Sequence, residues 1–316
     1  MSVKIAPFYI LLAGVLWGTT GTTQAFAPEN AHPIAIGAAR LAAGGLFLLC
    51  MVLMAGKLDL KNWPIRNTLL ASLCMALYQP LFFSAVTLTG VAIGTVTAIG
   101  SAPVLSGFLE WMYLKKRPSV IWWWSTSMSI FGCVLLFMNK SSVHMDPAGL
   151  LMALGAGLTF AGYTLVSRGL VENYSSLSVV AVVFTLSAIL LSPFLFIFDM
   201  SWLASVRGVT VSLHLGILAT GIAYFLFSKG LVHVSSSAAV TLALAEPLTA
   251  ALLGVFLLGE SLNMTSWLGV FLLLLGIGVL IGSSKASGGN LEPGVVEKHR
   301  ASNKKPVRTR DYRKSN

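Results

Sequence analysis

The chain has 316 residues, of which 56% are hydrophobic and only 10% are charged, and its mean hydropathy is +0.82. A soluble domain of this size could not keep so much apolar surface out of water, so the composition indicates an integral membrane protein. The formal net charge of +10 comes largely from eight Lys and Arg residues between Lys298 and Lys314, so the rest of the chain is only mildly basic.

Apolar windows of about 20 residues, the length that crosses a hydrocarbon core of ~30 Å, recur along the chain. In chain order we predict spanning helices at 7–26, 34–55, 68–88, 91–113, 120–138, 148–167, 177–198, 210–231, 236–258 and 266–282. Ala25-Phe26-Ala27 superficially fits a signal-peptide cleavage site, but the polar stretch Thr19–Gln24 stands where apolar residues should continue. We therefore expect the first helix to be retained. The prediction is an all-α integral membrane protein with about ten transmembrane helices.

The two halves of the chain resemble each other. Leu105–Leu114, which follows Ser-Ala-Pro at 101–103, matches Thr249–Leu258, which follows Ala-Glu-Pro at 245–247. Further matches join Leu11–Thr20 to Leu150–Thr159 and the mid-segment Tyr78 to Tyr224. Five helices per half is an odd number, so the second half must enter the membrane inverted. We predict two inverted five-helix repeats, at 8–138 and 148–282, an arrangement found in many transporters.

Loop charges predict the orientation of the helices. The ends that we assign to the cytoplasm carry Lys4, Lys57, Lys61, Arg66, Lys115, Lys116, Arg117, Arg168 and Lys229. The other side carries only Lys140 and Arg207. The excess of positive charge places both termini in the cytoplasm, and we expect a multi-pass protein of a bacterial-type inner (plasma) membrane.

The segment 283–316 has a different composition from the rest of the chain. Gly, Ser, Asn, Pro and charged residues replace the apolar ones, so it cannot bury enough surface to fold alone. We interpret it as a disordered, basic cytosolic tail that enforces topology. Contact with anionic lipid headgroups is the alternative. We expect no nucleic-acid binding, because no folded recognition module accompanies the charge.

Several motifs make the chain similar to a known family. They are Trp17-Gly18, Arg40, and above all Glu246-Pro247 followed by Leu257-Leu258-Gly259-Glu260. With the repeat, they resemble the EamA family of the drug/metabolite transporter superfamily. The resemblance implies ten helices around a central cavity and transport of small metabolites. It does not specify the substrate, because members of the family transport amino acids, amines, nucleosides, sugars and drugs. The chain departs from the family pattern at Lys115-Lys116 and at Ala156, where the second repeat lacks the tryptophan.

Two charged side chains fall inside predicted spans, where polar groups are expensive. Glu246 lies near the middle of its span, beside Pro247, which removes a backbone donor and frees the carbonyl of Ala243. Burial disfavours the charged form of a carboxyl, so Glu246 could bind and release a proton, meet a cationic substrate group, or only pack between helices. Arg40 could hold a carboxylate, pair with Glu246, snorkel outward to the interface, or lock helices together.

Other polar and aromatic side chains form a candidate cavity wall. Trp17 and Gln24 lie on one face of the first helix, and Gly14 with Gly18 offers a small-residue contact on another side. Tyr78, Gln79 and Tyr224 fall near mid-membrane, and Tyr163 aligns with Gln24 in the repeat. Packing in the core is the alternative for each aromatic residue. The interior prolines Pro103 and Pro247 occupy equivalent positions, where they could form hinges or static kinks.

The sequence lacks recognisable catalytic motifs. It has no Gly-rich phosphate loop, no HExxH and no nucleophile elbow, and Cys50, Cys74 and Cys133 are isolated. We therefore expect no enzyme activity, no cofactor and no metal. The function that we predict is secondary transport of a small metabolite by alternating access. The first candidate substrate is an amino acid or related compound, which we expect to be exported in a proton-coupled process. The alternatives are an uncoupled facilitator and a non-transporting receptor, scaffold or lipid-handling protein. We expect the protein to be a monomer or a homodimer.

Overall fold

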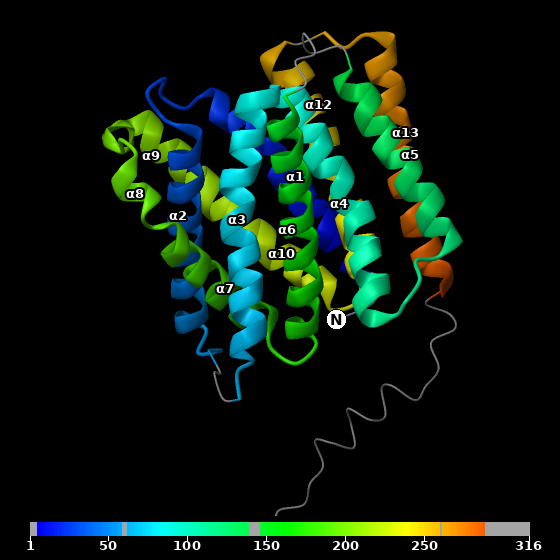
Figure 1. Cartoon of the computed structure of the whole chain (residues 1–316), viewed down its shortest axis with the longest axis horizontal. Coiled ribbons are helices and arrows are strands. Elements are labelled where there is room, and N and C mark those ends of the chain that lie inside the picture. The colour runs from blue at the N-terminus through cyan, green and yellow to red at the C-terminus, as the bar shows by residue number, and fades with distance from the viewer. Residues whose placement is uncertain (1–4, 59–61, 139–145, 260, 288–316) are drawn as a thin grey trace, which may run out of the picture.

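The computed structural model describes residues 5–58, 62–138, 146–259 and 261–287 (Figure 1). All regular elements in these ranges are helices, which confirms the predicted fold class. They are α1 (Ala6–Ala25), α2 (Pro33–Met54), α3 (Ile65–Thr89), α4 (Val91–Leu114), α5 (Val120–Phe137), α6 (Pro147–Val171), α7 (Ser176–Leu191), α8 (Phe194–Ile197), η2 (Ser201–Ala204), α9 (Val206–Leu213), η3 (His214–Ile222), α10 (Ala223–Leu231), α11 (Ser236–Leu242), α12 (Ala245–Leu258) and α13 (Met264–Ser287).

Within the described ranges, nine segments are long and apolar enough to cross a membrane. They correspond to the predicted spans from the second onward, with α7 and α8 forming one crossing, α9, η3 and α10 another, and α11 and α12 a third. The remaining predicted span is α1, which has the length but is made less apolar by Thr19–Gln24. Helix α13 continues five residues beyond the predicted 282. Lys4, Lys61, Lys140, Glu260 and the basic tail from residue 288 onward lie outside the described residues.

Large apolar side chains cover the outside of the bundle. Leu46, Trp124, Phe271 and Phe196 are each more than half exposed. In water such a surface would be strongly unfavourable, but hydrocarbon is its matching solvent. The protein is therefore a multi-pass membrane protein.

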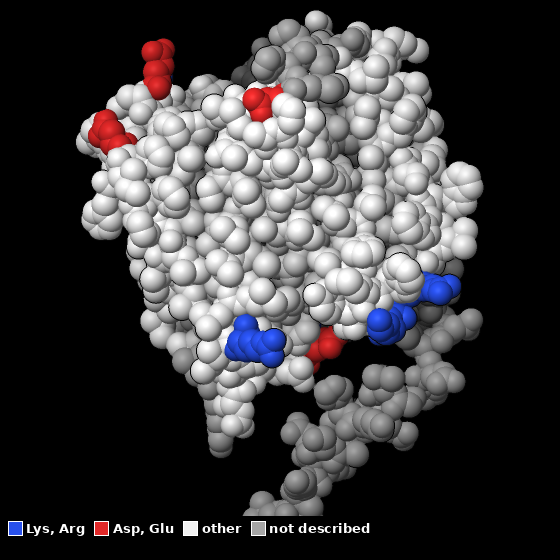
Figure 2. Space-filling view, viewed as in Figure 1, with Lys and Arg blue, Asp and Glu red and all other residues white. Residues whose placement is uncertain are grey.

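Charged groups separate toward the two ends of the bundle. We call the end where α1 begins and α4 finishes, at Ala6 and Leu114, the basic end; the end at Ala25 and Val91 is the opposite end. On the face shown in Figure 2, Lys and Arg lie toward the lower, basic end and most Asp and Glu toward the upper one. The chain begins at the lower end in Figure 1. Because five spans precede it, α6 enters from the opposite end, as an inverted repeat requires.

Equivalent glycines of the two repeats allow two close helix crossings. Gly18 of α1 packs against Glu246 and Thr249 of α12, so closely that a Cβ atom at position 18 would overlap Thr249. Gly157, its counterpart in α6, packs closely against Ala98 and Ser101 of α4, about one helical turn from the positions that match Glu246 and Thr249. The α1–α12 contact includes Gly14, as the small-residue pattern predicts. The repeat is thus visible in how helices pack.

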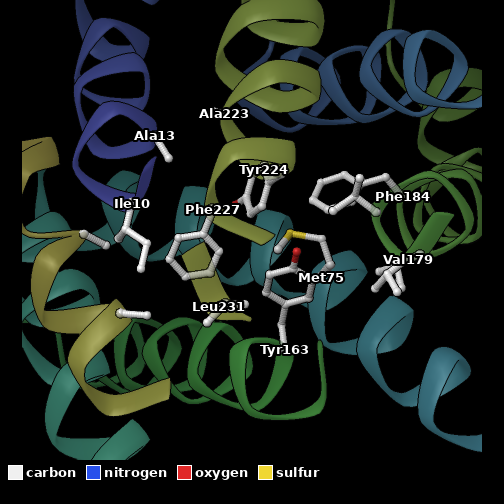
Figure 3. Close-up of a cluster of buried hydrophobic side chains, with 14 of the residues drawn as sticks. Ile10, Ala13, Met75, Tyr163, Val179, Phe184, Ala223, Tyr224, Phe227 and Leu231 are labelled. Carbon is white, nitrogen blue, oxygen red and sulfur yellow. The ribbon is translucent and has the colours of Figure 1, made fainter. Parts of the chain in front are cut away.

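A hydrophobic cluster fills the bundle toward the basic end (Figure 3). Tyr224 lies at its centre, with ring centroids 4.5 Å from Phe184, 5.7 Å from Tyr163 and 4.8 Å from Trp17. Phe227 of α10 packs between Trp17 and the Phe160 ring of α6. These side chains come from α1, α6, α7 and α10, so they close the bundle between its middle and the basic end.

Two helices depart from regular α geometry. The span containing Glu246 is interrupted between Leu242 and Ala245, although the equivalent α4 runs unbroken through Pro103. Because Pro247 has no N–H group, the carbonyl of Ala243 accepts from the nearer amide of Glu246 at 2.9 Å instead. The carbonyl of Ala243 thus lacks a bond from position 247, as predicted, but it is not left free, and the two equivalent prolines do not act alike. The second departure is η3, a nine-residue π-helix.

Candidate functional site: a central cavity

A cavity of about 360 Å³ lies among α1, α2, α3, α4, α11 and α12. Its lining residues extend from Trp17 to Gln24 on α1, from Tyr78 to Thr87 on α3 and from Thr95 to Ala102 on α4. On each of these helices the lined stretch runs from the middle toward the opposite end. The cavity therefore reaches from the middle of the bundle toward the opposite end, and the cluster of Figure 3 lies on its other side.

The structure brings seven of the eight predicted site residues to this cavity. The seven are Trp17, Gln24, Arg40, Tyr78, Gln79, Tyr224 and Glu246. Tyr163 lies elsewhere: it is 1% exposed and packs edge-on against Phe184 and Tyr224 in the hydrophobic cluster, as Figure 3 shows. One turn earlier on the same helix, Phe160 lines the cavity in its place.

Aromatic rings form the wall of the cavity near the middle of the bundle. Phe160 lies 5.9 Å from Trp17 and 5.8 Å from Tyr78 between ring centroids, and Tyr78 stacks on Phe82 at 5.7 Å. Rings at these separations pack as a rigid group and present both apolar faces and polar edges. The sequence did not indicate that Phe160 lines the cavity, because a phenylalanine in a membrane helix is equally typical of a core residue or a lipid-facing one.

Glu246 places a carboxylate at the middle of the cavity wall. It lies in the first turn of α12, where the positive end of the helix dipole favours a negative charge. Gly14 and Gly18 let α1 approach the α12 backbone at this point, so the residue is held by close helix packing. Among the described residues, none donates a hydrogen bond to its side chain or forms an ion pair with it within 4.0 Å. The carboxylate is therefore available to a ligand.

Arg40 of α2 also lines the cavity, and its guanidinium group is held firmly. It is only 8% exposed; its Nε donates to Thr220 Oγ1 at 2.7 Å, and its Nη2 donates to the carbonyl of Ala219 at 3.1 Å. Both acceptors belong to η3, and Thr220 Oγ1 in turn donates to the carbonyl of Leu215. Segments of π-helix are rare and occur often at functional sites. Arg40 thus locks α2 to η3 and also lines the cavity, without an ion pair to Glu246 among the contacts of the described residues.

Gln79 adds an amide to the cavity wall. Its side chain is 2% exposed and lines the cavity, yet it makes no hydrogen bond to another described residue. Its Oε1 lies beside Gly37 of α2, where a Cβ atom would come within 3.3 Å. A buried amide without a protein partner is costly, so its position favours a polar ligand or solvent in the cavity.

The fold and cavity define a class: a membrane protein of inverted helical repeats around a central site, the architecture of secondary carriers. The model of the EamA-like transporter family matches residues 4–138 and 147–282. The chain belongs to this family.

Its similarity to individual proteins agrees with that membership. The chain is 54% identical to YwfM, an uncharacterized transporter of Bacillus subtilis, over 89% of this chain and 95% of that protein. It is 26% identical to YicL, an uncharacterized inner membrane transporter of Salmonella typhimurium, over 84% of this chain and 91% of that protein. A solved crystal structure matches with a TM-score of 0.80 over 90% of this chain and 99% of the other, at 19% identity, which shows the fold alone.

Proposed function

We propose that this protein is a secondary transporter that exports a small amino acid-like metabolite across a bacterial plasma membrane by alternating access. The basic end then faces the cytoplasm and holds both termini, in agreement with the positive-inside rule. The observation that carries the proposal is an unpaired carboxylate, Glu246, in a cavity lined by both repeats at the middle of the bundle. Midplane sites between inverted repeats are where secondary carriers bind their substrates.

The side chains of the cavity favour a zwitterion with an apolar body. Glu246 is placed to receive an ammonium group, and the anchored guanidinium of Arg40 is placed to receive a carboxylate. The rings of Trp17, Tyr78 and Phe160 offer faces to an apolar or aromatic side chain and to the cation itself. A volume of about 360 Å³ is at the small end of the range for ligand pockets, which favours a metabolite of amino acid size.

Proton coupling is part of the proposal. A proton and a substrate ammonium group would compete for the one carboxylate of Glu246, so arrival of either would release the other. Such competition converts an inward proton gradient into outward movement of the substrate. Coupling rests on Glu246, because the other acidic residues of the described ranges do not line the cavity.

The test is transport into liposomes that contain the purified protein. Labelled amino acids and related amines are screened with and without a pH gradient, for the native chain, for Glu246→Gln and for the control Glu172→Gln, which lies outside the cavity. Flux that follows the pH gradient and is lost only in Glu246→Gln supports the proposal. Flux that ignores pH and survives Glu246→Gln identifies a facilitator. Absence of flux for all solutes favours a receptor, scaffold or lipid-handling protein.

A further inference from the structure

A buried ion pair ties three helices together at the basic end. Glu110 of α4 is 4% exposed, and its Oε1 lies 3.0 Å from Nη1 of Arg168 on α6. Its other oxygen, Oε2, accepts a hydrogen bond of 3.0 Å from the backbone N–H of Ser237, in the first turn of α11. One carboxylate therefore forms an ion pair with a guanidinium of α6 and accepts a hydrogen bond from the N-terminus of α11, two distant parts of the chain.

The helices that meet near this ion pair also carry buried hydroxyl groups that lack protein partners. Ser106 is one turn before Glu110 on α4, Ser228 lies in the last turn of α10, and Ser236 begins α11. All three residues are fully buried, and their Oγ atoms make no hydrogen bond to a described residue. A serine in a helix commonly bonds the carbonyl four residues earlier, but these do not. Buried hydroxyls without partners are costly, and a state in which water reached them would satisfy them.

We propose that α4, α6, α10 and α11 enclose the closed cytoplasmic half of the transport path, and that the Glu110–Arg168 pair is the gate that keeps it shut. The inference rests on the proposed function, since a gate needs a substrate path to close. In this state the cavity reaches toward the opposite end, while the ion pair and the hydrophobic cluster block the basic end. For the cytoplasmic half to open, Glu110 must leave Arg168 or the N-terminus of α11.

The repeat provides no equivalent gate at the opposite end. The match between 101–103 and 245–247 puts Gly254 at the position of Glu110. A glycine has no carboxylate with which to form an ion pair. The gate therefore stabilises one of the two access states, and the cavity open toward the opposite end is the resting state.

The gate is tested by the accessibility of a cysteine placed behind it. Cys50, Cys74 and Cys133 are first replaced by Ala, and Ser106→Cys is introduced as the probe. A membrane-impermeant maleimide is then added to the cytoplasmic side of inside-out vesicles that hold the full chain. With the ion pair intact we expect slow labelling. Adding Glu110→Gln, which still accepts from Ser237 but loses the charge, should raise the labelling rate about tenfold or more, because the closed state is less favoured.

A matched control comes from the same arginine. Glu172 lies 3.8 Å from Arg168 Nε, but its side chain is 56% exposed, and Glu172→Gln should leave the labelling rate unchanged. A second probe, Gln24→Cys in the cavity, should label more slowly from the outer side in Glu110→Gln as the population moves to the other state. Arg168→Lys, which keeps the charge, should remain near the native rate.

Two outcomes overturn the gate. One is equal labelling of Ser106→Cys in Glu110→Gln and Glu172→Gln. The other is a rise at both probes together, which shows loosening of the whole bundle. Labelling needs no substrate, so the liposome measurement decides the proposed function separately from this result.

Discussion

The two ends of the helix bundle are held by different interactions. At the basic end, loops and helices are joined by hydrogen bonds between distant parts of the chain: Tyr174 Oη donates to the carbonyl of Asn62 at 2.6 Å and Ser178 Oγ to that of Lys57 at 2.7 Å, in addition to the buried pair at Glu110. At the opposite end the cavity separates the helices. The difference teaches that a backbone built from two similar repeats can be closed on one side and open on the other because its side chains differ.

The same asymmetry is present in the cavity. Glu246 has Ala102 as its counterpart in the first repeat, and Trp17 has Ala156 in the second. The glycines at 18 and 157, in contrast, are equivalent, and each allows a close crossing, with α12 and with α4 respectively. The repeats thus share small residues that let helices pack closely and the tyrosine pair Tyr78 and Tyr224, while the carboxylate of Glu246 and the indole of Trp17 occur once.

The largest expected effect is on the cavity carboxylate. Glu246→Gln should lower the initial rate of amino acid transport on the order of 100-fold, because leaving a charged partner unpaired costs about 2–5 kcal/mol. The measurement is uptake or efflux in liposomes. Glu29→Gln, at the exposed opposite end, is the control and should keep the native rate. An unchanged rate in Glu246→Gln removes this carboxylate from the site.

The second effect concerns the stability of the basic end. Arg168→Ala leaves Glu110 buried without its ion pair, and should lower the free energy of unfolding by about 2–4 kcal/mol, somewhat reduced because Arg168 is partly exposed. Glu172→Ala removes an exposed partner of the same arginine and should cost less than ~0.5 kcal/mol. Denaturant or thermal unfolding in detergent compares the two variants. Equal losses would mean that the buried pair contributes no more than a surface one.

The third effect tests the equivalence of the two repeats. Gly18→Ala puts a Cβ atom 2.7 Å from the carbonyl oxygen of Glu246, and Gly157→Ala puts one 2.8 Å from that of Ala98. Both should destabilise the protein by about 1–3 kcal/mol through overpacking. Gly21→Ala meets no atom within 4 Å and should be neutral or stabilising, because Ala favours a helix more than Gly. A large loss of unfolding free energy in only one of Gly18→Ala and Gly157→Ala would show that the two crossings are not equally tight.

The smallest effect is a surface titration outside the membrane. Hydrogen bonds from the side chain and backbone of Ser201 hold the pKa of the exposed Asp199 carboxyl below its ordinary value of 3.8. Its contribution to stability is therefore complete above pH 3.8 and is lost as the pH falls through the lowered pKa of the folded state. Asp199→Asn should remove this small dependence from unfolding curves recorded between about pH 2 and 5. Identical unfolding curves for the native chain and Asp199→Asn would contradict a stabilising role of the Asp199 carboxylate.

Much of the fold could be predicted because its causes are local. A span is recognised from some 20 apolar residues in a row, and Pro247 indicates the break near Ala243 from a missing N–H group. The π-helix η3 could not be predicted in this way. Its widened turns are bonded by Arg40, 179 residues away from Ala219 in the chain.

The candidate site was predictable where chemistry made a residue conspicuous. Glu246, Arg40 and Gln79 are polar groups in the middle of apolar spans, and the structure brings them to one cavity. Tyr163 and Phe160 show the limit, because one helical turn decides which ring faces the cavity and which faces the core. Glu110 gave no signal, since it stands near a helix end beside a basic loop and looks solvated.

The sequence by itself determined the number of helices, the inversion of the second repeat, and which polar residues are unfavourable in the membrane unless they have a partner. These follow from hydropathy, length and loop charge, which act over single segments. Only the tertiary structure decided which end is closed and which polar groups are paired. Glu110 and Arg168 are 58 residues apart and meet only when α4 packs on α6, whereas Glu246 is left unpaired by the same packing. Pairing across helices depends on distances that no single segment contains.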